Sequence, residues 1–347
     1  MTMKKNIKLR SSSIIGENIK PYFIAEMNTS HFGNMDVAKK MIEEAKNSGC
    51  DCVKFQSWSA DSLYSKSYYD ENPIAKRIFN KFALSEDEML EVANYCKEIE
   101  IDFSSTPYSN SEVDFLINDC NAAFIKIASM ELNNYPYLKY IGKTGVPIIL
   151  STGMGELGEI KKAVETIEKT GNKNICILHC ISIYPCETSS INLKNISGLI
   201  KEFPDYLIGY SDHSIGTEMA SAAIALGACV IEKHFTLDSS KIGMDNQMAT
   251  EPEEMTQMVQ NCKNVQIALG SPNRTVLFDE IEQRKNMRRS IIFNKDLNSG
   301  SKIKFEDLDV KRPGTGLPPE KINELVGQKL IKNVAGNTLV RLSDFSE

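Results

Sequence analysis

Between about residues 20 and 270, short apolar runs rich in β-branched residues alternate with longer amphipathic stretches. This alternation is typical of a parallel sheet in which each strand is followed by a covering helix. Eight such units in about 250 residues predict an α/β fold of the TIM (β/α)8 barrel type. The alternative is an open doubly wound sheet, but no run is followed by the GxGxxG pattern. The expected strands are Tyr22–Glu26, Cys52–Gln56, Ile101–Ser105, Phe124–Ala128, Pro147–Ser151, Asn174–His179, Tyr206–Tyr210 and Cys229–His234.

Four stretches between these runs carry helix signals. Apolar residues recur at helical spacing in Asp36–Lys46, and a glycine follows just past its end. Ser85–Lys97 opens with the Ser-x-x-Glu pattern of a capping box. The stretches Gly158–Lys169 and Glu251–Ala268 follow the same logic. We therefore expect helices at these four places, each covering the strand before it.

The pattern changes after Gly270. A Ser-Pro-Asn-Arg-Thr segment interrupts it, a charged stretch follows, and the remainder consists of short strand pieces between turn clusters. This composition predicts a small, mostly β domain. We expect a barrel domain over residues 1–275, a linker over 276–289 and the small domain over 290–347.

Charge and composition exclude several classes of protein. The chain has 46 acidic and 40 basic residues and no run of lysine and arginine, so we do not expect nucleic acid as a partner. The longest nearly apolar stretch, Met219–Ile231, is shorter than the roughly 20 residues that span a bilayer, so no membrane span is expected. The N-terminus lacks the apolar region of a signal peptide. Nine cysteines without a CxxC pair indicate reduced thiols and a cytoplasmic protein.

Polar residues gather at the carboxyl ends of the expected strands, where TIM barrels place their active sites. Three of the four histidines close a strand, and His213 and His234 close two consecutive ones. Their imidazoles could converge on one divalent cation. The alternative is two hydrogen-bonded core histidines. Asp212 and Glu232 flank the pair and could either orient the rings or be charges of a solvated loop or of the barrel floor.

Lys54 and Lys126 lie inside apolar strands, where an unpaired ammonium is costly and a bound anion would offset that cost. With the hydroxyls of Thr106, Ser129 and Ser151 they could hold a phosphate or a carboxylate. Two alternatives remain open. A lysine could instead pair with a barrel carboxylate such as Glu26 or Glu131, or it could form a Schiff base as in an aldolase.

Nine short strings together resemble the bacterial sialic acid synthase family, which includes legionaminic and pseudaminic acid synthases. The resemblance runs from about residue 20 to the C-terminus. It implies a TIM barrel followed by a SAF (antifreeze-like) domain, and a transferase that condenses phosphoenolpyruvate with an N-acetylated hexosamine. The strings are Ile24-Ala-Glu-Met-Asn28 with Ser30-His-Phe-Gly33, Val53-Lys-Phe-Gln56, Ser105-Thr-Pro-Tyr-Ser109, Phe124-Ile-Lys-Ile-Ala-Ser129, Leu150-Ser-Thr-Gly-Met154, Leu178-His-Cys180, Tyr210-Ser-Asp-His213, Ile231-Glu-Lys-His-Phe-Thr236 and Lys311-Arg-Pro-Gly-Thr-Gly316.

The resemblance also implies roles for single residues. The phosphate and carboxylate of phosphoenolpyruvate would be held by Lys54, Thr106, Lys126, Ser129, Ser151, Ser182 and Ser211. His213 and His234 would bind Mn²⁺ or Mg²⁺. The sugar and the reacting carbons would be faced by Glu26, Gln56, Tyr108, Glu131, Tyr184 and Asp245. Glu26 is the candidate for stabilising the cationic carbon or handling the water proton, with Glu131 as the alternative, and Arg312 would reach the site of the partner subunit in a domain-swapped homodimer.

The chain departs from the family pattern at a few positions. Ser182 stands where members often carry asparagine, and Gly243-Met-Asp-Asn246 replaces a common Gly-Pro-Asp-His. The aromatic residue that some members place before the small domain is not found among Asn286-Met-Arg-Arg-Ser290. Because these positions bear on the sugar side, the resemblance predicts a nonulosonic acid synthase but leaves the sugar open between N-acetylmannosamine and a 2,4-diacetamido-trideoxyhexose. Other readings are another phosphoenolpyruvate- or pyruvate-dependent barrel synthase or aldolase, or a catalytically inactive sugar-binding protein.

Overall fold

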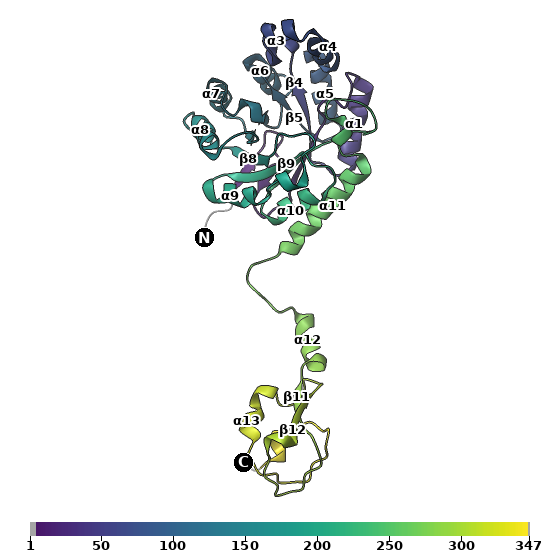
Figure 1. The fold of residues 1–347 in the computed structure, drawn as a ribbon, viewed down its shortest axis with the longest axis vertical. Coiled ribbons are helices and arrows are strands. Elements are labelled where there is room, and N and C mark those ends of the chain that lie inside the picture. Colours follow the sequence, from purple (N-terminus) through teal and green to yellow (C-terminus); the bar gives the residue numbers. More distant parts are fainter. Residues whose placement is uncertain (1–4, 346–347) are drawn as a thin grey trace. The chain divides into compact units, whose positions relative to one another are not determined.

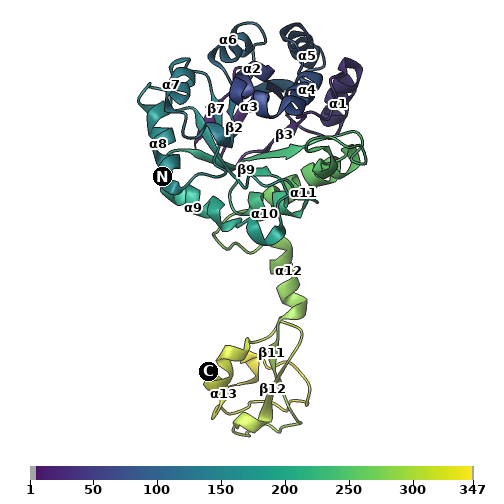
Figure 2. The same ribbon diagram turned by 45° about the horizontal axis from the view of Figure 1, so that its top comes forward.

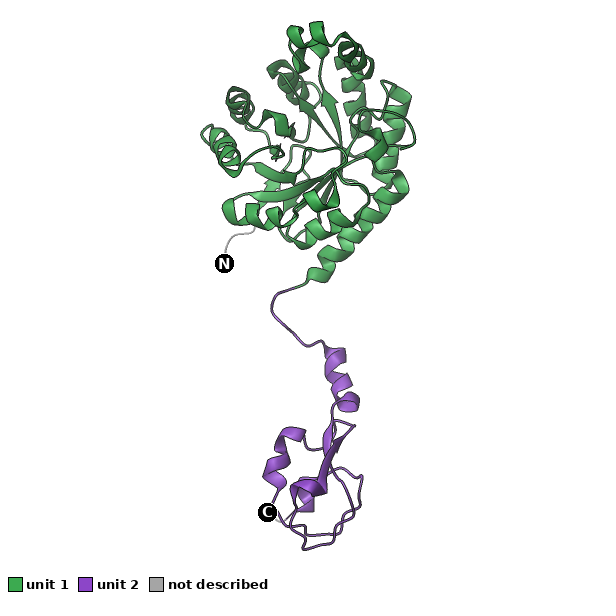
Figure 3. Cartoon of the chain, viewed as in Figure 1, with its two compact units in different colours: residues 1–270 green, residues 271–347 purple. Residues whose placement is uncertain are grey.

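The computed structural model of the chain describes residues 5–345. The chain forms two compact units, Met1–Gly270 and Ser271–Glu347, which Figure 3 shows in different colours. The first contains the barrel and the second the small domain. Residues 276–289, for which the sequence suggests a linker, include helix α12 (Phe278–Met287) of the second unit.

Within residues 5–345, eight parallel strands close into a barrel, in which β10 pairs with β3 to complete the circle. Every strand lies within two residues of its expected bounds, so the barrel prediction is confirmed. The open-sheet alternative is wrong. The strands are β3 (Tyr22–Glu26), β4 (Cys52–Ser57), β5 (Asp102–Pro107), β6 (Ile125–Ile127), β7 (Ile148–Ser151), β8 (Ile175–Cys180), β9 (Leu207–Asp212) and β10 (Val230–His234).

A helix on the outside of the barrel follows each strand, as Figures 1 and 2 show. The four helices expected from the sequence are α1, α5, α8 and α11, and the capping box at Ser85 is formed, with the Ser85 hydroxyl accepting from the Glu88 N–H. In chain order the covering helices are α1 (Met35–Asn47), α5 (Glu86–Glu98), α6 (Asn110–Asn118), α7 (Tyr135–Lys143), α8 (Leu157–Glu168), α9 (Lys194–Glu202), α10 (Glu218–Ala225) and α11 (Pro252–Leu269).

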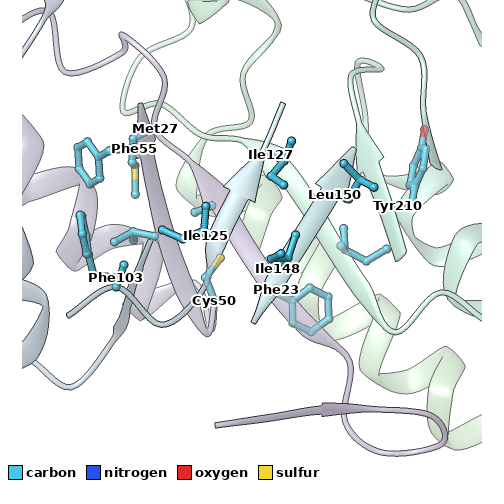
Figure 4. Close-up of a cluster of buried hydrophobic side chains, with 14 of the residues drawn as sticks. Phe23, Met27, Cys50, Phe55, Phe103, Ile125, Ile127, Ile148, Leu150 and Tyr210 are labelled. Carbon is cyan, nitrogen blue, oxygen red and sulfur yellow. The ribbon is translucent and has the colours of Figure 1, made fainter. Parts of the chain in front are cut away.

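Alternation of side chains along the strands decides what faces the barrel interior. In β6, Ile125 and Ile127 join the apolar layer between strands and helices, whereas Lys126 points the other way into the barrel. In β4, Phe55 joins the same layer and Lys54 faces inward. Figure 4 shows Phe55, Ile125 and Ile127 in this layer. Each buried Phe or Ile contributes about 1.5–3 kcal/mol, which offsets the cost of a charged interior.

The amino-terminal end of the barrel is filled by a hairpin that the sequence analysis did not predict. Strands β1 (Asn6–Lys8) and β2 (Ile14–Gly16) pair antiparallel. Ile7 and Ile15 are buried in a cluster with the inward-facing apolar residues of the barrel strands, such as Phe124. The interior is therefore apolar at this end, and the polar side chains are confined to the carboxyl end.

A second unpredicted feature is an insert of three short helices between β4 and α5. They are α2 (Ala60–Leu63), α3 (Lys66–Glu71) and α4 (Pro73–Phe82). Ala60, Tyr69 and Phe79 form a small apolar cluster of their own, separate from the main core.

The second unit is built around the antiparallel strands β11 (Ser290–Phe293) and β12 (Leu308–Lys311). Isolated bridges such as Ile292 to Leu339 extend the pairing, and helix α13 (Ile322–Leu325) is short. Buried Ile291, Phe293 and other apolar side chains form its core. The expectation of a small, mostly β domain is confirmed.

Two further observations bear on the classes excluded above. Over residues 5–345, no helix is long and apolar enough to cross a membrane. All nine cysteines are buried and unpaired, so no disulfide links any part of the described chain.

Candidate active site

A cavity of about 360 Å³ opens at the carboxyl ends of the barrel strands. It lies where the sequence placed the active site, because all strands are parallel and their carboxyl ends meet on one face. Of the sixteen expected site residues, it brings together Glu26, Lys54, Gln56, Thr106, Tyr108, Lys126, Ser129, Ser151, Ser182, Tyr184, Ser211, His213, His234 and Asp245.

The floor of the cavity carries two lysines and two glutamates, all at most 5% exposed. Lys54 forms an ion pair with Glu26, and its Nζ lies 3.8 Å from Glu232 Oε2. The Nζ of Lys126 lies 3.6 Å from Glu232 Oε1. Glu232 thus bridges the two ammonium groups. The four charges balance, which is how a barrel interior can hold them without bound ligand.

The two carboxylate oxygens of Glu26 differ in the number of hydrogen bonds that they accept. Its Oε1 accepts from the Asn28 backbone N–H (3.0 Å) and from the Gln56 side-chain amide (2.9 Å). Its Oε2 is buried against Lys54 and accepts no other hydrogen bond within the described residues. Burial raises the pKa of Glu26, although Lys54 acts in the opposite direction. This carboxylate therefore takes up a proton more readily than an exposed glutamate does, as a proton acceptor must.

The pKa of Glu232 is shifted in the opposite direction from that of Glu26. Burial acts to raise its pKa, but Lys126 and Lys54 outweigh burial and hold the pKa below its usual value. The Ser211 hydroxyl donates to its Oε1 (3.0 Å). Glu232 is therefore a fixed negative charge, while Glu26 can titrate, and this difference separates the roles of the two carboxyls.

Each lysine also bonds a hydroxyl on a neighbouring strand. Lys54 Nζ donates to Thr106 Oγ1 (3.0 Å), and Lys126 Nζ donates to Ser151 Oγ (2.6 Å). Burial acts to lower the pKa of Lys54, but Glu232 and Glu26 outweigh it and raise the pKa. For Lys126 burial prevails, and the pKa is lowered. The two ammonium groups with their hydroxyls form two adjacent sets of hydrogen-bond donors.

A glycine opens space beside these positions. A Cβ added at Gly153 would lie 2.2 Å from Ser182 Oγ and 2.9 Å from Ser129 Oγ. The Gly153 N–H donates to Ser129 Oγ (3.0 Å), whereas Ser182 Oγ is buried and has no partner within residues 5–345. The free hydroxyl of Ser182 can therefore donate to an anion bound next to Gly153.

The two strand-end histidines lie together, as the sequence suggested. Their ring centroids are 5.5 Å apart, and Tyr184 packs against both. Burial lowers the pKa of each ring, so both are neutral at pH 7. His213 Nδ1 lies 2.7 Å from the Ile181 carbonyl oxygen and must donate its hydrogen there. The other ring nitrogen, Nε2, therefore carries no hydrogen and has a lone pair for a ligand. Two neutral imidazoles side by side, one of them held in this tautomer, fit a divalent cation.

Two expected site residues lie elsewhere. Glu131 is not among the residues lining this cavity in the described chain, and its carboxylate accepts from the Asn134 side chain (2.7 Å). Arg312 belongs to the second unit, is exposed, and donates from Nε to the Met287 carbonyl (3.1 Å).

Asp212 does not orient the histidines. It faces the opposite side of the sheet from Ser211, and Lys233 Nζ donates to its Oδ2 (2.9 Å). Both side chains of this ion pair are at most 1% exposed. The pair is structural because period-two alternation carries residues 212 and 233 away from the cavity.

Several lining residues were not identified from the sequence. Glu232 was weighed only as a flanking carboxylate, yet it bridges both lysines. Asn28 joins Glu26 to the Asp245 carboxylate. The remaining missed residues are apolar or aromatic and follow the strand ends, in loops and in the short helices α2 and α4: Trp58, Leu63, Tyr64, Phe79, Ala128, Met130, Met154 and Met244. The three methionines carry no sequence signal of a site, and only their position at the strand ends shows them to be lining residues.

Comparison with known proteins identifies the family. The NeuB family model matches residues 41–274, and the SAF domain model matches residues 288–346. The N,N'-diacetyllegionaminic acid synthase of Legionella pneumophila is 36% identical over 97% of this chain and 98% of its own length. The pseudaminic acid synthase of Campylobacter jejuni is 32% identical over 94% of this chain and 97% of its own.

Solved structures agree with this assignment. The crystal structure of N-acetylneuraminic acid synthetase from Leptospira borgpetersenii, in complex with citrate, superimposes with a TM-score of 0.74 at 30% identity. The match covers 82% of this chain and 98% of that chain. The relatives of the present chain are named for three different acids. The comparisons therefore establish the class of enzyme and leave the sugar open. The chain therefore belongs to the NeuB family and is an acid synthase, a transferase of the NeuB type, with a SAF domain after its barrel.

Proposed function

We propose that this protein is a nonulosonic acid synthase that condenses phosphoenolpyruvate with an N-acetylated hexosamine and water, giving a nine-carbon α-keto acid and phosphate. The candidate sugars are N-acetylmannosamine and a 2,4-diacetamido-trideoxyhexose. The observation that carries the proposal is the presence of two buried lysines beside two neutral histidines in one cavity. Such a cavity offers positions for a dianionic enol phosphate and for the aldehyde of a sugar.

Phosphoenolpyruvate would occupy the charged floor. Its phosphate and carboxylate would take the two positions formed by Lys54 with Thr106 and by Lys126 with Ser151. The free hydroxyl of Ser182 and those of Ser129 and Ser211 would add directional hydrogen bonds. A bound anion would also bring a second negative charge, besides Glu232, to Lys126, whose ammonium burial disfavours.

The histidines would hold the cation. His213 and His234 would supply two neutral nitrogen ligands to Mn²⁺ or Mg²⁺, and the Ile181 carbonyl would keep His213 in the required tautomer. A divalent cation supplies Lewis acidity at the aldehyde oxygen of the sugar. Tyr184, which packs on both rings, would keep them in place and limit water around them.

The covalent steps balance with water as the only further reactant. C3 of phosphoenolpyruvate attacks the aldehyde carbon, a C–C bond forms, and the aldehyde oxygen takes up a proton. The cationic character left at C2 faces the floor carboxylates. Water then adds at C2 and loses a proton, for which Glu26 is the acceptor. Finally the bond between C2 and the phosphate oxygen breaks, and the hydroxyl at C2 loses its proton to give the ketone.

Phosphate release tests this proposal. With Mn²⁺ and phosphoenolpyruvate, we expect phosphate to appear only when an acceptor sugar is added, and in equal amount to the keto acid. In ¹⁸O-labelled water the label should enter the keto acid and not the phosphate, because the C–O bond is the one that breaks. Label in the phosphate, or a lysine adduct trapped by borohydride with pyruvate, would contradict the proposal and favour an aldolase.

We also propose that the protein acts as a domain-swapped homodimer, with Arg312 of one subunit serving the barrel of the other. The loops after β6 to β10 expose large apolar side chains around the cavity, which is typical of a covered surface. They are Met130, Met154, Ile183, Ile215, Ile242 and Met244. Arg312 is exposed and its guanidinium is free to bond beyond its own domain through its terminal nitrogens.

Mixing two inactive variants tests the exchange. Lys126→Met inactivates the barrel but keeps Arg312, and Arg312→Ala does the reverse. After the two are co-refolded, a swapped heterodimer contains one barrel with an intact floor and an intact Arg312 from its partner. Activity should therefore return in the mixture, and a mixture as inactive as its parts would contradict the swap.

A further inference from the structure

The insert of α2, α3 and α4 is a small body with its own packing. The ring of Tyr64 stacks on Tyr68 with centroids 4.3 Å apart and on Phe79 at 5.4 Å. The Tyr69 hydroxyl donates to the Ala60 carbonyl (2.7 Å). A hydrogen bond from Ser62 to Glu112 (2.6 Å) fixes the insert to the start of α6. The insert therefore holds its shape independently of the barrel core.

This insert contributes an apolar wall to the active-site cavity. Leu63, Tyr64 and Phe79 line the same cavity as the lysines and histidines. Trp58, which directly precedes the insert, packs edge-on against Tyr108 with ring centroids 6.4 Å apart. The loop after β10 adds Met244 to this lining. We refer to Trp58, Leu63, Tyr64, Phe79 and Met244 as the apolar wall.

Charge is distributed unevenly over the cavity. The lysines, Glu26, Glu232 and the histidines all lie at strand ends, and Asp245 is the one ionised lining side chain contributed by a longer loop within the described chain. The insert contributes no charged group to the lining. The cavity thus has a charged floor for the reacting atoms and an apolar wall above it, so the two ends of a bound sugar meet different surroundings.

The wall also holds one buried donor. The indole N–H of Trp58 is buried and has no hydrogen-bond partner within residues 5–345. A buried donor without a partner is costly, and the carbonyl oxygen of a substrate acylamino group would satisfy it. A wall that is mostly apolar, with the Trp58 N–H and the Tyr64 hydroxyl as its polar groups, fits an N-acetyl group better than a row of hydroxyls.

We propose that the α2–α4 insert is the sugar-selecting element of this enzyme and that it favours a diacetamido sugar with a methyl group at C6 over one with a hydroxymethyl group there. This inference rests on the proposed condensation, which puts the sugar's aldehyde at the floor. Because C1 and C6 are the two ends of the sugar's carbon chain, C6 would then lie away from the floor, toward the wall. A C6 hydroxyl against Leu63 and Phe79 would lose its hydrogen bonds to water without finding new ones. The C6 methyl group gains contact there.

The test compares two sugars that differ only at C6. These are a 2,4-diacetamido-2,4,6-trideoxyhexose and the corresponding 2,4-diacetamido-2,4-dideoxyhexose, assayed by phosphate release. The wild type should prefer the 6-deoxy sugar in kcat/KM by at least about tenfold, given the combined loss of a methyl contact and of a hydroxyl's solvation. Leu63→Gln should reduce this preference about fivefold or more and leave the KM for phosphoenolpyruvate unchanged.

Ile74→Gln is the matched control. Ile74 lies on α4 of the same insert but is 70% exposed and does not line the cavity, so the preference should stay as in the wild type. Met244→Gln alters the wall from another loop and should shift the preference in the same direction even if Leu63→Gln unfolds the insert.

The two proposals fail in different ways. Release of phosphate from phosphoenolpyruvate when no acceptor sugar is present overturns the proposed condensation. Phosphate release with equal rates for the two sugars, or an unchanged preference in both Leu63→Gln and Met244→Gln, overturns the assignment of the apolar wall while leaving the condensation in place.

Discussion

Replacing Lys126 with methionine tests the anion site directly, because methionine is close in length and carries no charge. Lys126 Nζ bonds Ser151 Oγ at 2.6 Å and lies 3.6 Å from Glu232. If this ammonium binds phosphoenolpyruvate, its loss removes one charge-assisted hydrogen bond to the substrate. We therefore expect weaker substrate binding with little change in the folded structure.

The size of the effect follows from the geometry. A pair of unit charges 3.6 Å apart interacts by at most about 5 kcal/mol at an effective dielectric constant of about 20. The net contribution of a hydrogen bond to a charged group is smaller, about 1.5–3 kcal/mol. Lys126→Met should therefore weaken phosphoenolpyruvate binding roughly 10- to 150-fold. Isothermal titration calorimetry measures this affinity without requiring turnover.

Lys233→Met is the matched control, because Lys233 is also a buried barrel lysine. It donates to Asp212 Oδ2 (2.9 Å) and to the Ser214 carbonyl (2.8 Å), away from the cavity. Breaking a buried ion pair costs about 3–5 kcal/mol of stability. Both substitutions remove a buried ion pair and should lower the melting temperature, but only Lys126→Met should weaken phosphoenolpyruvate binding. Wild-type affinity in Lys126→Met would refute the anion-site argument.

Three further predictions concern other parts of the molecule. His234→Ala should abolish turnover and weaken Mn²⁺ binding measured by calorimetry, and full activity in a chelated wild-type sample would contradict the metal role. Arg312→Ala should impair use of the sugar while the barrel stays folded; Arg289→Ala, another exposed arginine bonded to one backbone carbonyl, serves as control. Burial lowers the pKa of His31 from 6.5 to about 4, so the unfolded chain binds a proton that the folded chain does not. Stability should fall by up to about 3 kcal/mol as pH drops from about 6.5 to 4, and His31→Asn should flatten this dependence in urea titrations, whereas an unchanged slope would contradict it.

The strands could be read from the sequence because their signal is local. Lys54 sits between Val53 and Phe55, and Lys126 sits between Ile125 and Ile127, so a period of two already separates the apolar face from the charged one. The same period predicts that both lysines face the interior of a closed sheet. It cannot say which carboxylate each lysine meets.

The pairing of charges depends on contacts between distant strands. Glu232 lies on β10, more than 100 residues from Lys126, and approaches it only because the barrel closes. Glu131 follows Lys126 closely in sequence but turns to Asn134. The sequence offered Glu26 or Glu131 as a partner for the lysines; in the closed barrel Lys54 pairs with Glu26, and Glu232 bridges both lysines.

The two unpredicted elements, the β1–β2 hairpin and the α2–α4 insert, also depend on contacts between segments that are distant in sequence. The β1–β2 hairpin is stabilised by apolar residues that six of the barrel strands bring to one end of the barrel, and the insert presents Leu63 to a cavity made mostly by other segments. The sequence by itself determined the barrel, the small domain and the residues at strand ends, because backbone periodicity is encoded within a few residues. Only the tertiary structure decided the ion pairs of the floor and the apolar wall, because these arise from side chains that meet after the barrel has closed.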